Sequence, residues 1–166
     1  VYPNARAVNL GVGGARSSDV VASQLQRAIE LRPDLVTLSV GPNDITGRVS
    51  LDAYEANLDT IFKTLTRQTR AAVVANLLPD LAITPRFARG ELSDVVGRRT
   101  VAFNEALART GKKYGIELVD LYVASREEVP KRPELVGADG YHPSDAGYAR
   151  WAELLWTGVE RRLAAR

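Results

Sequence analysis

Cysteine and methionine are both absent from the 166-residue sequence, and histidine occurs only once, at position 142. Without cysteine the chain can form no disulfide, thiolate nucleophile or thiolate-bound zinc site, and it gives no indication of its cellular compartment. No apolar stretch approaches the ~18 residues that a membrane-spanning helix needs. Any imidazole chemistry at neutral pH must therefore involve His142.

Basic and acidic residues occur in nearly equal numbers, so the chain has no large excess of charge of one sign. Twenty-two Lys and Arg residues against 20 Asp and Glu residues give a net charge of +2, and the basic residues are scattered apart from a few arginines near the C-terminus. Nucleic-acid binding requires a clustered basic face, so no nucleic-acid partner is expected. The length fits one domain over residues 1–166. Because position 1 is not methionine, we expect this domain to be N-terminally incomplete.

Short β-rich runs alternate with longer segments of helical period, which predicts βαβ units and a parallel sheet. The expected strands cover residues 5–10, 35–40, 71–77 and 116–121, and the expected helices cover residues 18–31, 51–69, 94–114 and 145–163. Two of the helices carry apolar stripes that should pack on a sheet, at positions 54, 58, 61, 62 and 65 and at positions 148, 151, 152, 155 and 159. Ser50 and Ser144 precede helical patterns and are expected to be N-caps.

Two connections are longer than a compact α/β domain requires. They cover residues 79–93 and 122–143, and both are rich in proline and glycine. Long loops in compact domains commonly carry function, so both are expected to shape a binding site.

The segment Asp-Gly-Tyr-His-Pro-Ser at positions 139–144 contains the single histidine. An aspartate three residues before a histidine can fold back and accept a hydrogen bond from Nδ1, which leaves Nε2 free to act as a general base. Asp139 and His142 would then form two-thirds of a catalytic triad. The alternative is a solvated turn with no catalytic role.

Two further motifs follow predicted strands, where the loops and helix N-termini of a parallel sheet converge on ligands. One is the glycine-rich run at positions 9–15, and the other is Gly-Pro-Asn-Asp at positions 41–44. Backbone N–H groups at such a turn and an asparagine amide can stabilise an oxyanion, which makes Gly14 and Asn43 candidate donors. The alternatives are a phosphate-binding turn, which the placement of Arg16 disfavours, and a plain turn in which Asp44 is structural.

The three blocks N-L-G-V-G-G-A, G-P-N-D and D-G-Y-H-P-S, in this order, resemble conserved blocks of the SGNH hydrolases, also called GDSL-type lipases and esterases. The resemblance implies a flavodoxin-like three-layer α/β/α sandwich with a parallel sheet. It also implies a serine-type hydrolase that cleaves carboxylic esters or O-acyl groups of a small-molecule or lipid substrate through an acyl-enzyme, with no cofactor and no metal. By this resemblance Gly14 and Asn43 form the oxyanion hole, His142 is the general base and Asp139 orients it.

The sequence departs from the family at the nucleophile, because no Gly-Asp-Ser block precedes the glycine-rich run. Ser17 and Ser18 begin a predicted helix, Ser39 lies in a predicted strand and Ser144 is a predicted cap, so none occupies a nucleophile turn. We therefore expect the nucleophilic serine outside these 166 residues. The same segment would supply the first, central strand of the sheet, whose absence would leave a gap of roughly 10 Å between neighbouring strands.

Two other functions remain compatible with these motifs. One is a catalytically inactive SGNH-like module that binds an acylated sugar or lipid without cleaving it. The other is a phosphate-binding regulator of flavodoxin-like fold, which would place an anion at the glycine-rich turn and would not need contact between Asp139 and His142.

Overall fold

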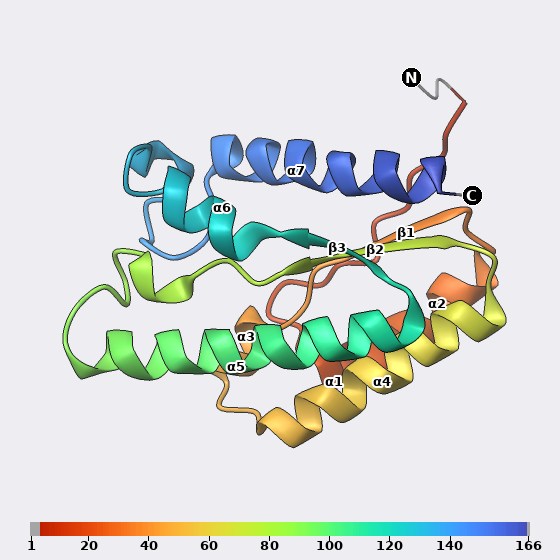
Figure 1. The fold of residues 1–166 in the computed structure, drawn as a ribbon, viewed down its shortest axis with the longest axis horizontal. Coiled ribbons are helices and arrows are strands. Elements are labelled where there is room, and N and C mark those ends of the chain that lie inside the picture. The colour runs from red at the N-terminus through yellow and green to blue at the C-terminus, as the bar shows by residue number, and fades with distance from the viewer. Residues whose placement is uncertain (1–3, 166) are drawn as a thin grey trace.

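The structure, a computed structural model, describes residues 4–165 and contains one parallel sheet with helices on both faces (Figure 1). The strands are β1 (Leu35–Leu38), β2 (Ala72–Leu77) and β3 (Glu117–Asp120), in the order β1-β2-β3. Both pairs are parallel, with Leu35 opposite Ala72 and Val74 opposite Glu117. The predicted parallel α/β class is therefore confirmed.

The helices match most of the predicted helical segments. They are α1 (Ser17–Asp19), η1 (Val20–Gln24, one π-helical turn), α2 (Leu25–Glu30), α3 (Pro42–Thr46), α4 (Leu51–Gln68), η2 (Leu81–Ile83, 3-10), α5 (Glu91–Tyr114), α6 (Leu121–Glu128), η3 (Pro133–Leu135, 3-10) and α7 (Asp145–Ala164). As predicted, Ser50 and Ser144 cap α4 and α7 by accepting from the backbone N–H groups of Ala53 and Gly147.

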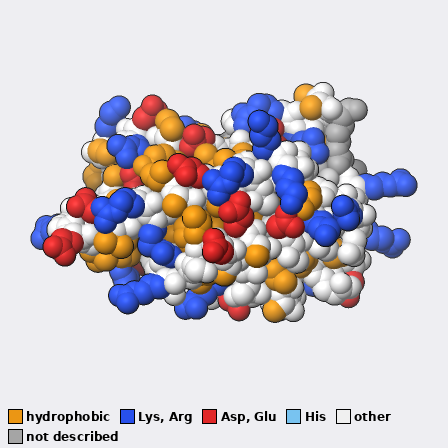
Figure 2. All heavy atoms as spheres, turned by 60° about the horizontal axis from the view of Figure 1, so that its bottom comes forward, with side chains coloured by type: hydrophobic (Ala, Val, Ile, Leu, Met, Phe, Trp, Pro, Cys, Tyr) orange, Lys and Arg blue, Asp and Glu red, His pale blue; other side chains and the backbone are white. Residues whose placement is uncertain are grey.

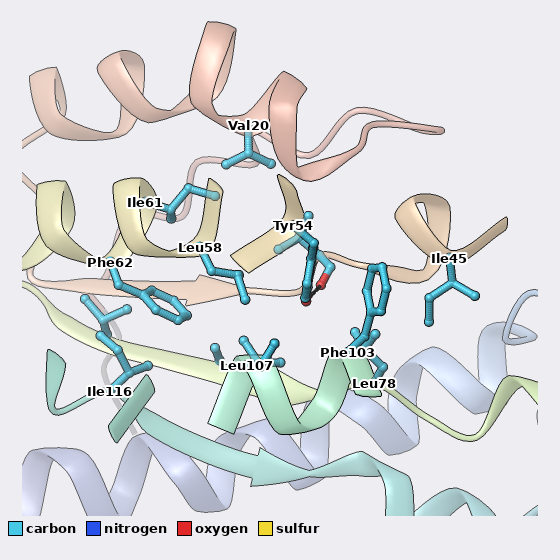
Figure 3. Close-up of a cluster of buried hydrophobic side chains, with 14 of the residues drawn as sticks. Val20, Ile45, Tyr54, Leu58, Ile61, Phe62, Leu78, Phe103, Leu107 and Ile116 are labelled. Carbon is cyan, nitrogen blue, oxygen red and sulfur yellow. Dashed lines mark hydrogen bonds between the residues drawn. The ribbon is translucent and has the colours of Figure 1, made fainter. Parts of the chain in front are cut away.

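The main core lies between the sheet and the pair α4 and α5 (Figure 3). The predicted stripe of α4 is buried throughout, at Tyr54, Leu58, Ile61, Phe62 and Leu65. The ring of Tyr54 stacks on Phe103 of α5 with ring centroids 4.5 Å apart. Burial of side chains of this size contributes about 1.5–3 kcal/mol each, so this layer provides most of the apolar stabilisation.

Acidic and basic side chains are interspersed over the outer face of α4 and α5 (Figure 2). Arg109 and Lys113 of α5 form ion pairs with Glu55 and Asp59 of α4, at 3.1 Å and 2.5 Å. Such exposed pairs contribute little to stability. They nevertheless join two helices that both cover the same face of the sheet.

The opposite face of the sheet is covered more sparsely, by α7 and α6 (Figure 1). Here the prediction of a fully packed stripe on α7 was wrong in part. Val159 is buried, but Trp151 and Leu155 are only half-buried and Tyr148 is 53% exposed. Helix α7 approaches the sheet closely at Gly158, where a Cβ would lie 2.4 Å from a methyl group of Val119.

The predicted strand over residues 5–10 was wrong. This segment has no strand structure, and its residues are exposed apart from the half-buried Leu10. A strand requires a neighbouring backbone to complete its hydrogen-bond ladder. The strand expected between β1 and residues 5–10 would have paired with both. Within residues 4–165, β1 pairs only with β2, so no such strand is present there to complete a ladder with residues 5–10.

Three boundaries also differ from prediction. The predicted long loop over 122–143 contains α6, because the side chain of Asp120 caps it by accepting from Val123 N–H. Helix α5 begins three residues early, at Glu91 rather than residue 94, after Gly90, whose φ is positive (67°). The first helical segment is interrupted by the single π-helical turn of η1.

Candidate active site

The Gly-Pro-Asn-Asp turn leads directly from the end of β1 into α3. Gly41 adopts φ 137°, and a Cβ there would lie 2.8 Å from both Leu78 and the Tyr54 hydroxyl. Only glycine fits that conformation and that space. The turn places Asn43 in the first turn of α3, half-buried at the C-terminal edge of the sheet.

The side chain of Asn43 connects this turn to the glycine-rich loop. Its Nδ2 donates to the backbone carbonyl of Ala15 at 2.9 Å. An amide carries two N–H groups, so one donor remains for a ligand. Ala15 directly follows Gly14, which lies in a turn closed by the bond from Ala15 N–H to the Val12 carbonyl (3.1 Å). Gly14 adopts φ 80° and is exposed, and the structure thus brings both predicted oxyanion donors to neighbouring segments.

The predicted contact between Asp139 and His142 is confirmed. His142 Nδ1 lies 2.5 Å from Asp139 Oδ2, and Asp139 Oδ1 accepts from the backbone N–H groups of Tyr141 and His142, each at 3.0 Å. These hydrogen bonds, first that of the imidazole and then those of the two N–H groups, lower the pKa of Asp139 to about 2. The carboxylate is therefore charged at neutral pH and can hold an imidazolium or a neutral Nδ1–H.

The turn that carries this pair is held by the loop over residues 79–90. Arg86 N–H donates to the Gly140 carbonyl at 2.9 Å. The Tyr141 ring packs edge-on against Phe87, with centroids 5.4 Å apart, and the Arg86 guanidinium lies 5.7 Å from the Tyr141 ring centroid. The sequence predicted that this loop shapes the site, but it did not predict the contacts that Arg86 and Phe87 make with Gly140 and Tyr141, because these partners are distant in sequence.

A cavity of about 480 Å³ adjoins both groups. Its wall includes Asn43 and Ala15 on one side and Tyr141 and His142 on another, and Trp151 belongs to its apolar part. An apolar cavity with a few convergent polar groups is the usual form of a small-molecule site. The structure therefore places the predicted base and one predicted oxyanion donor on the same cavity.

One ion pair also lines the cavity. Arg150 donates through Nε and Nη2 to Glu128, with the shortest distance 2.8 Å. These hydrogen bonds lower the pKa of Glu128. The carboxylate is thus ionised and occupied, which makes it unsuitable as a general acid.

The four serines considered above as nucleophiles have other partners or places, and the hydroxyl of Ser125, which also lines the cavity, donates to the Tyr122 carbonyl at 2.9 Å and accepts from Asp80 N–H at 2.9 Å. Ser17 is fully buried, and its hydroxyl donates to Asp44 at 2.5 Å, while Ser144 caps α7 and donates to the Glu134 carbonyl at 2.5 Å. Ser18 is exposed on α1. Ser39 lines the cavity just after β1, in a segment to which neither a helix nor a turn is assigned.

Two further findings concern only residues 4–165. No cluster of three or more histidine, aspartate and glutamate side chains there has the geometry to bind a metal ion. In the same range, none of the helices combines the length and hydropathy of a membrane span.

A sequence model of the GDSL-like Lipase/Acylhydrolase family matches residues 1–150. The chain belongs to this family. By family, therefore, it is an ester hydrolase of the serine type. A curated relative, an acetylxylan esterase from Geobacillus stearothermophilus, is 27% identical over 161 residues, which cover 89% of this chain and 70% of the relative.

Two solved structures share the fold of this GDSL-family chain. The acetylxylan esterase of Geobacillus stearothermophilus superposes with a TM-score of 0.75 at 23% identity, over 92% of this chain and 71% of that one. An α/β hydrolase from the metagenome of Lake Arreo, Spain, gives a TM-score of 0.76 at 22% identity, over 92% of this chain and 72% of that one. At this level of identity the likeness establishes the fold alone.

Proposed function

We propose that this protein hydrolyses O-acyl esters, with short acyl groups such as acetyl on a carbohydrate hydroxyl as the preferred substrates. The observation that carries the proposal is the 2.5 Å contact between Asp139 and His142 beside a cavity that Asn43 also lines. The acetylxylan esterase relative supports the choice of substrate.

In this mechanism a serine hydroxyl attacks the acyl carbon while Nε2 of His142 takes its proton. The negative oxygen of the tetrahedral intermediate is stabilised by Gly14 N–H and by the second N–H of the Asn43 amide. Asp139 holds the imidazolium. The alcohol leaves with the proton from His142, and a water molecule activated by the same imidazole then releases the carboxylic acid.

Catalytic variants of the acetylxylan esterase support these roles. Its solved structures include catalytic mutants in which a serine, an aspartate or a histidine is replaced by alanine. The replaced aspartate lies three positions before the replaced histidine, which is the spacing of Asp139 and His142 in this chain.

We further propose that the nucleophilic serine lies on a segment outside these 166 residues, which completes the domain. Two features support this. Among the residues that the structure describes, one edge of β1 has no pairing strand and can accept one, and Thr37 in β1 is exposed although its partner Val74 of β2 is buried. On the sparsely covered face, the half-buried Trp151 and Leu155 line the apolar end of the cavity. The helix that follows such a strand would fill that end and leave the polar end, beside Asn43 and His142, for the substrate. A serine at the end of that strand would lie at the same sheet edge as Asn43.

The experiment compares the 166-residue chain with the full-length protein on p-nitrophenyl acetate and on acetylated xylooligosaccharide. We expect activity only from the full-length protein, together with labelling of one serine by a serine-directed phosphonate. Mass spectrometry then locates the label. A label on any serine of the 166 residues, or turnover at enzyme-like rates by these residues alone, would contradict an external nucleophile. Binding of the acetylated oligosaccharide by the full-length protein without turnover or labelling would instead favour the inactive binding module.

The pH dependence should reflect imidazole and not Asp139. Because the pKa of Asp139 is lowered to about 2, its carboxylate stays ionised at every pH above about 4, and the support that it gives is lost only as the pH falls toward 2. The general base must be neutral, so kcat/KM should rise with pH within the pH 5–8 range where histidine side chains ordinarily titrate. A rate profile measured from pH 4 to 9 tests this, and a flat profile between pH 5 and 8 would remove His142 as the base.

A further inference from the structure

Asp44 is a fully buried carboxylate beside the candidate oxyanion donor Asn43. Its two oxygens accept from Ser17 N–H at 3.1 Å and 3.0 Å, and Oδ1 also accepts from the Ser17 hydroxyl at 2.5 Å. Burying a carboxylate costs free energy unless hydrogen bonds compensate, and the two donors of Ser17, its N–H shared between both oxygens and its hydroxyl, do so here. The arrangement is a specific connection between α3 and the start of α1.

A second layer holds the partner of Asp44. The Ser17 hydroxyl accepts from Nδ2 of Asn57 at 2.9 Å, and Asn57 lies on α4. Because α4 packs through its apolar face into the main core, Ser17 and Asp44 are tied to a helix that the core holds in place.

The same two segments are also joined through Asn43. Its amide donates to the Ala15 carbonyl, one residue after Gly14, while Asp44 binds Ser17, two residues after Ala15. Two adjacent residues of α3, Asn43 and Asp44, therefore bind the stretch from Ala15 to Ser17, which directly follows Gly14. This double connection fixes both the distance and the rotation between the segments that carry Gly14 and Asn43.

We propose that Asp44 is a positioning residue for the oxyanion hole. Oxyanion donors are effective only when held about 2.7–3.1 Å from the position of the developing charge, so the segments that carry them must not move relative to each other. Asp44 supplies that constraint without touching the substrate. The inference rests on the proposed function, since it assigns Asn43 and Gly14 to the oxyanion.

The kinetic test uses Asp44→Asn in the full-length enzyme, with active sites counted by phosphonate labelling. We expect kcat to fall roughly 10- to 100-fold with KM changed less than about twofold, because ground-state binding does not need the oxyanion donors. In the Asn43→Ala background the same substitution should lower kcat by a clearly smaller factor, because one of the two donors whose relative placement Asp44 fixes is already absent. Fully additive losses would overturn the proposal.

Two variants guard against a failure to fold. Asp44→Asn places an amide donor against the Ser17 donors, so Ser17→Ala provides a milder change that keeps the backbone bond to Asp44. We expect Ser17→Ala to lower kcat by roughly 3- to 10-fold at unchanged KM and Ser17→Thr to restore it. Asp52→Asn, at an exposed aspartate of α4, is the matched control and should leave kcat unchanged. Equal losses in Ser17→Ala and Ser17→Thr would also contradict the proposal.

A structural readout separates this inference from the proposed function. If the wild-type full-length protein has no esterase activity, the proposed function fails, yet the side-chain amide signals of Asn43 in an NMR spectrum still report its placement. These signals should shift in Asp44→Asn and stay in place in Asp52→Asn. Unshifted Asn43 signals in a folded Asp44→Asn protein would show that Asp44 does not position the donor.

Discussion

Replacing His142 by alanine in the full-length enzyme is expected to lower kcat by about 10⁴–10⁶-fold, with KM changed far less. These 166 residues contain no second histidine that could take over the proton transfer. A serine hydroxyl without a base is a poor nucleophile at neutral pH, so phosphonate labelling should slow in parallel. Initial rates on p-nitrophenyl acetate, together with the labelling rate, measure both effects.

A graded pair of variants accompanies this prediction. Asp139→Asn keeps the shape of the side chain but removes the charge that accepts from Nδ1, and we expect a loss of roughly 10²–10⁴-fold in kcat. Asp139 is 46% exposed at its side chain, which favours the lower end of this range because water screens the lost charge. Asp145→Asn, at another exposed aspartate near the turn, is the matched control. Near-normal kcat in His142→Ala would exclude this residue as the general base.

The apolar pattern of α4 allowed its packing to be predicted residue by residue. The five predicted stripe positions of that helix are all buried. A similar pattern on α7 predicted the helix but not its burial, since Tyr148 is exposed and Trp151 is half-buried. Periodicity specifies which face of a helix is apolar, whereas burial also depends on what covers that face.

Strand prediction failed at residues 5–10 for a related reason. A β-rich composition shows that a segment can form a strand, but the strand forms only when a second segment lies beside it and completes the hydrogen-bond ladder. Helix α6 was not predicted, because Pro130 and Pro133 directly after it favoured a loop over the whole stretch, although Asp120 caps a short helix there. Both errors concern local patterns whose outcome depends on neighbours.

The polar residues of the candidate site were easier to predict from the sequence than the contacts that hold them in place. Asp139 and His142 are three residues apart, so local geometry alone could predict their contact. The bond from Arg86 N–H to the Gly140 carbonyl and the burial of Asp44 against Ser17 depend on the folded arrangement of distant segments. No spacing within one segment indicates such contacts.

Replacing Asn43 by alanine is expected to lower kcat by roughly 10²–10³-fold while KM changes little. The amide would donate to a charge that exists only in the transition state, so its removal should not weaken binding of the neutral ester. The loss of its bond to the Ala15 carbonyl adds a small structural effect, which thermal unfolding of the same variant measures separately.

Two comparisons identify the chemical origin of that loss. Asn43→Asp retains the size of the side chain but replaces the donor by a negatively charged acceptor, which repels an oxyanion, so kcat should fall at least as far as in Asn43→Ala. Gln24 lines the same cavity with an amide at a different position, and Gln24→Ala should keep kcat within about threefold. If Asn43→Ala keeps the wild-type kcat, stabilisation of the oxyanion cannot be assigned to Asn43. The same holds if Gln24→Ala lowers kcat as much as Asn43→Ala does, because an effect of cavity polarity alone would not distinguish between the two amides.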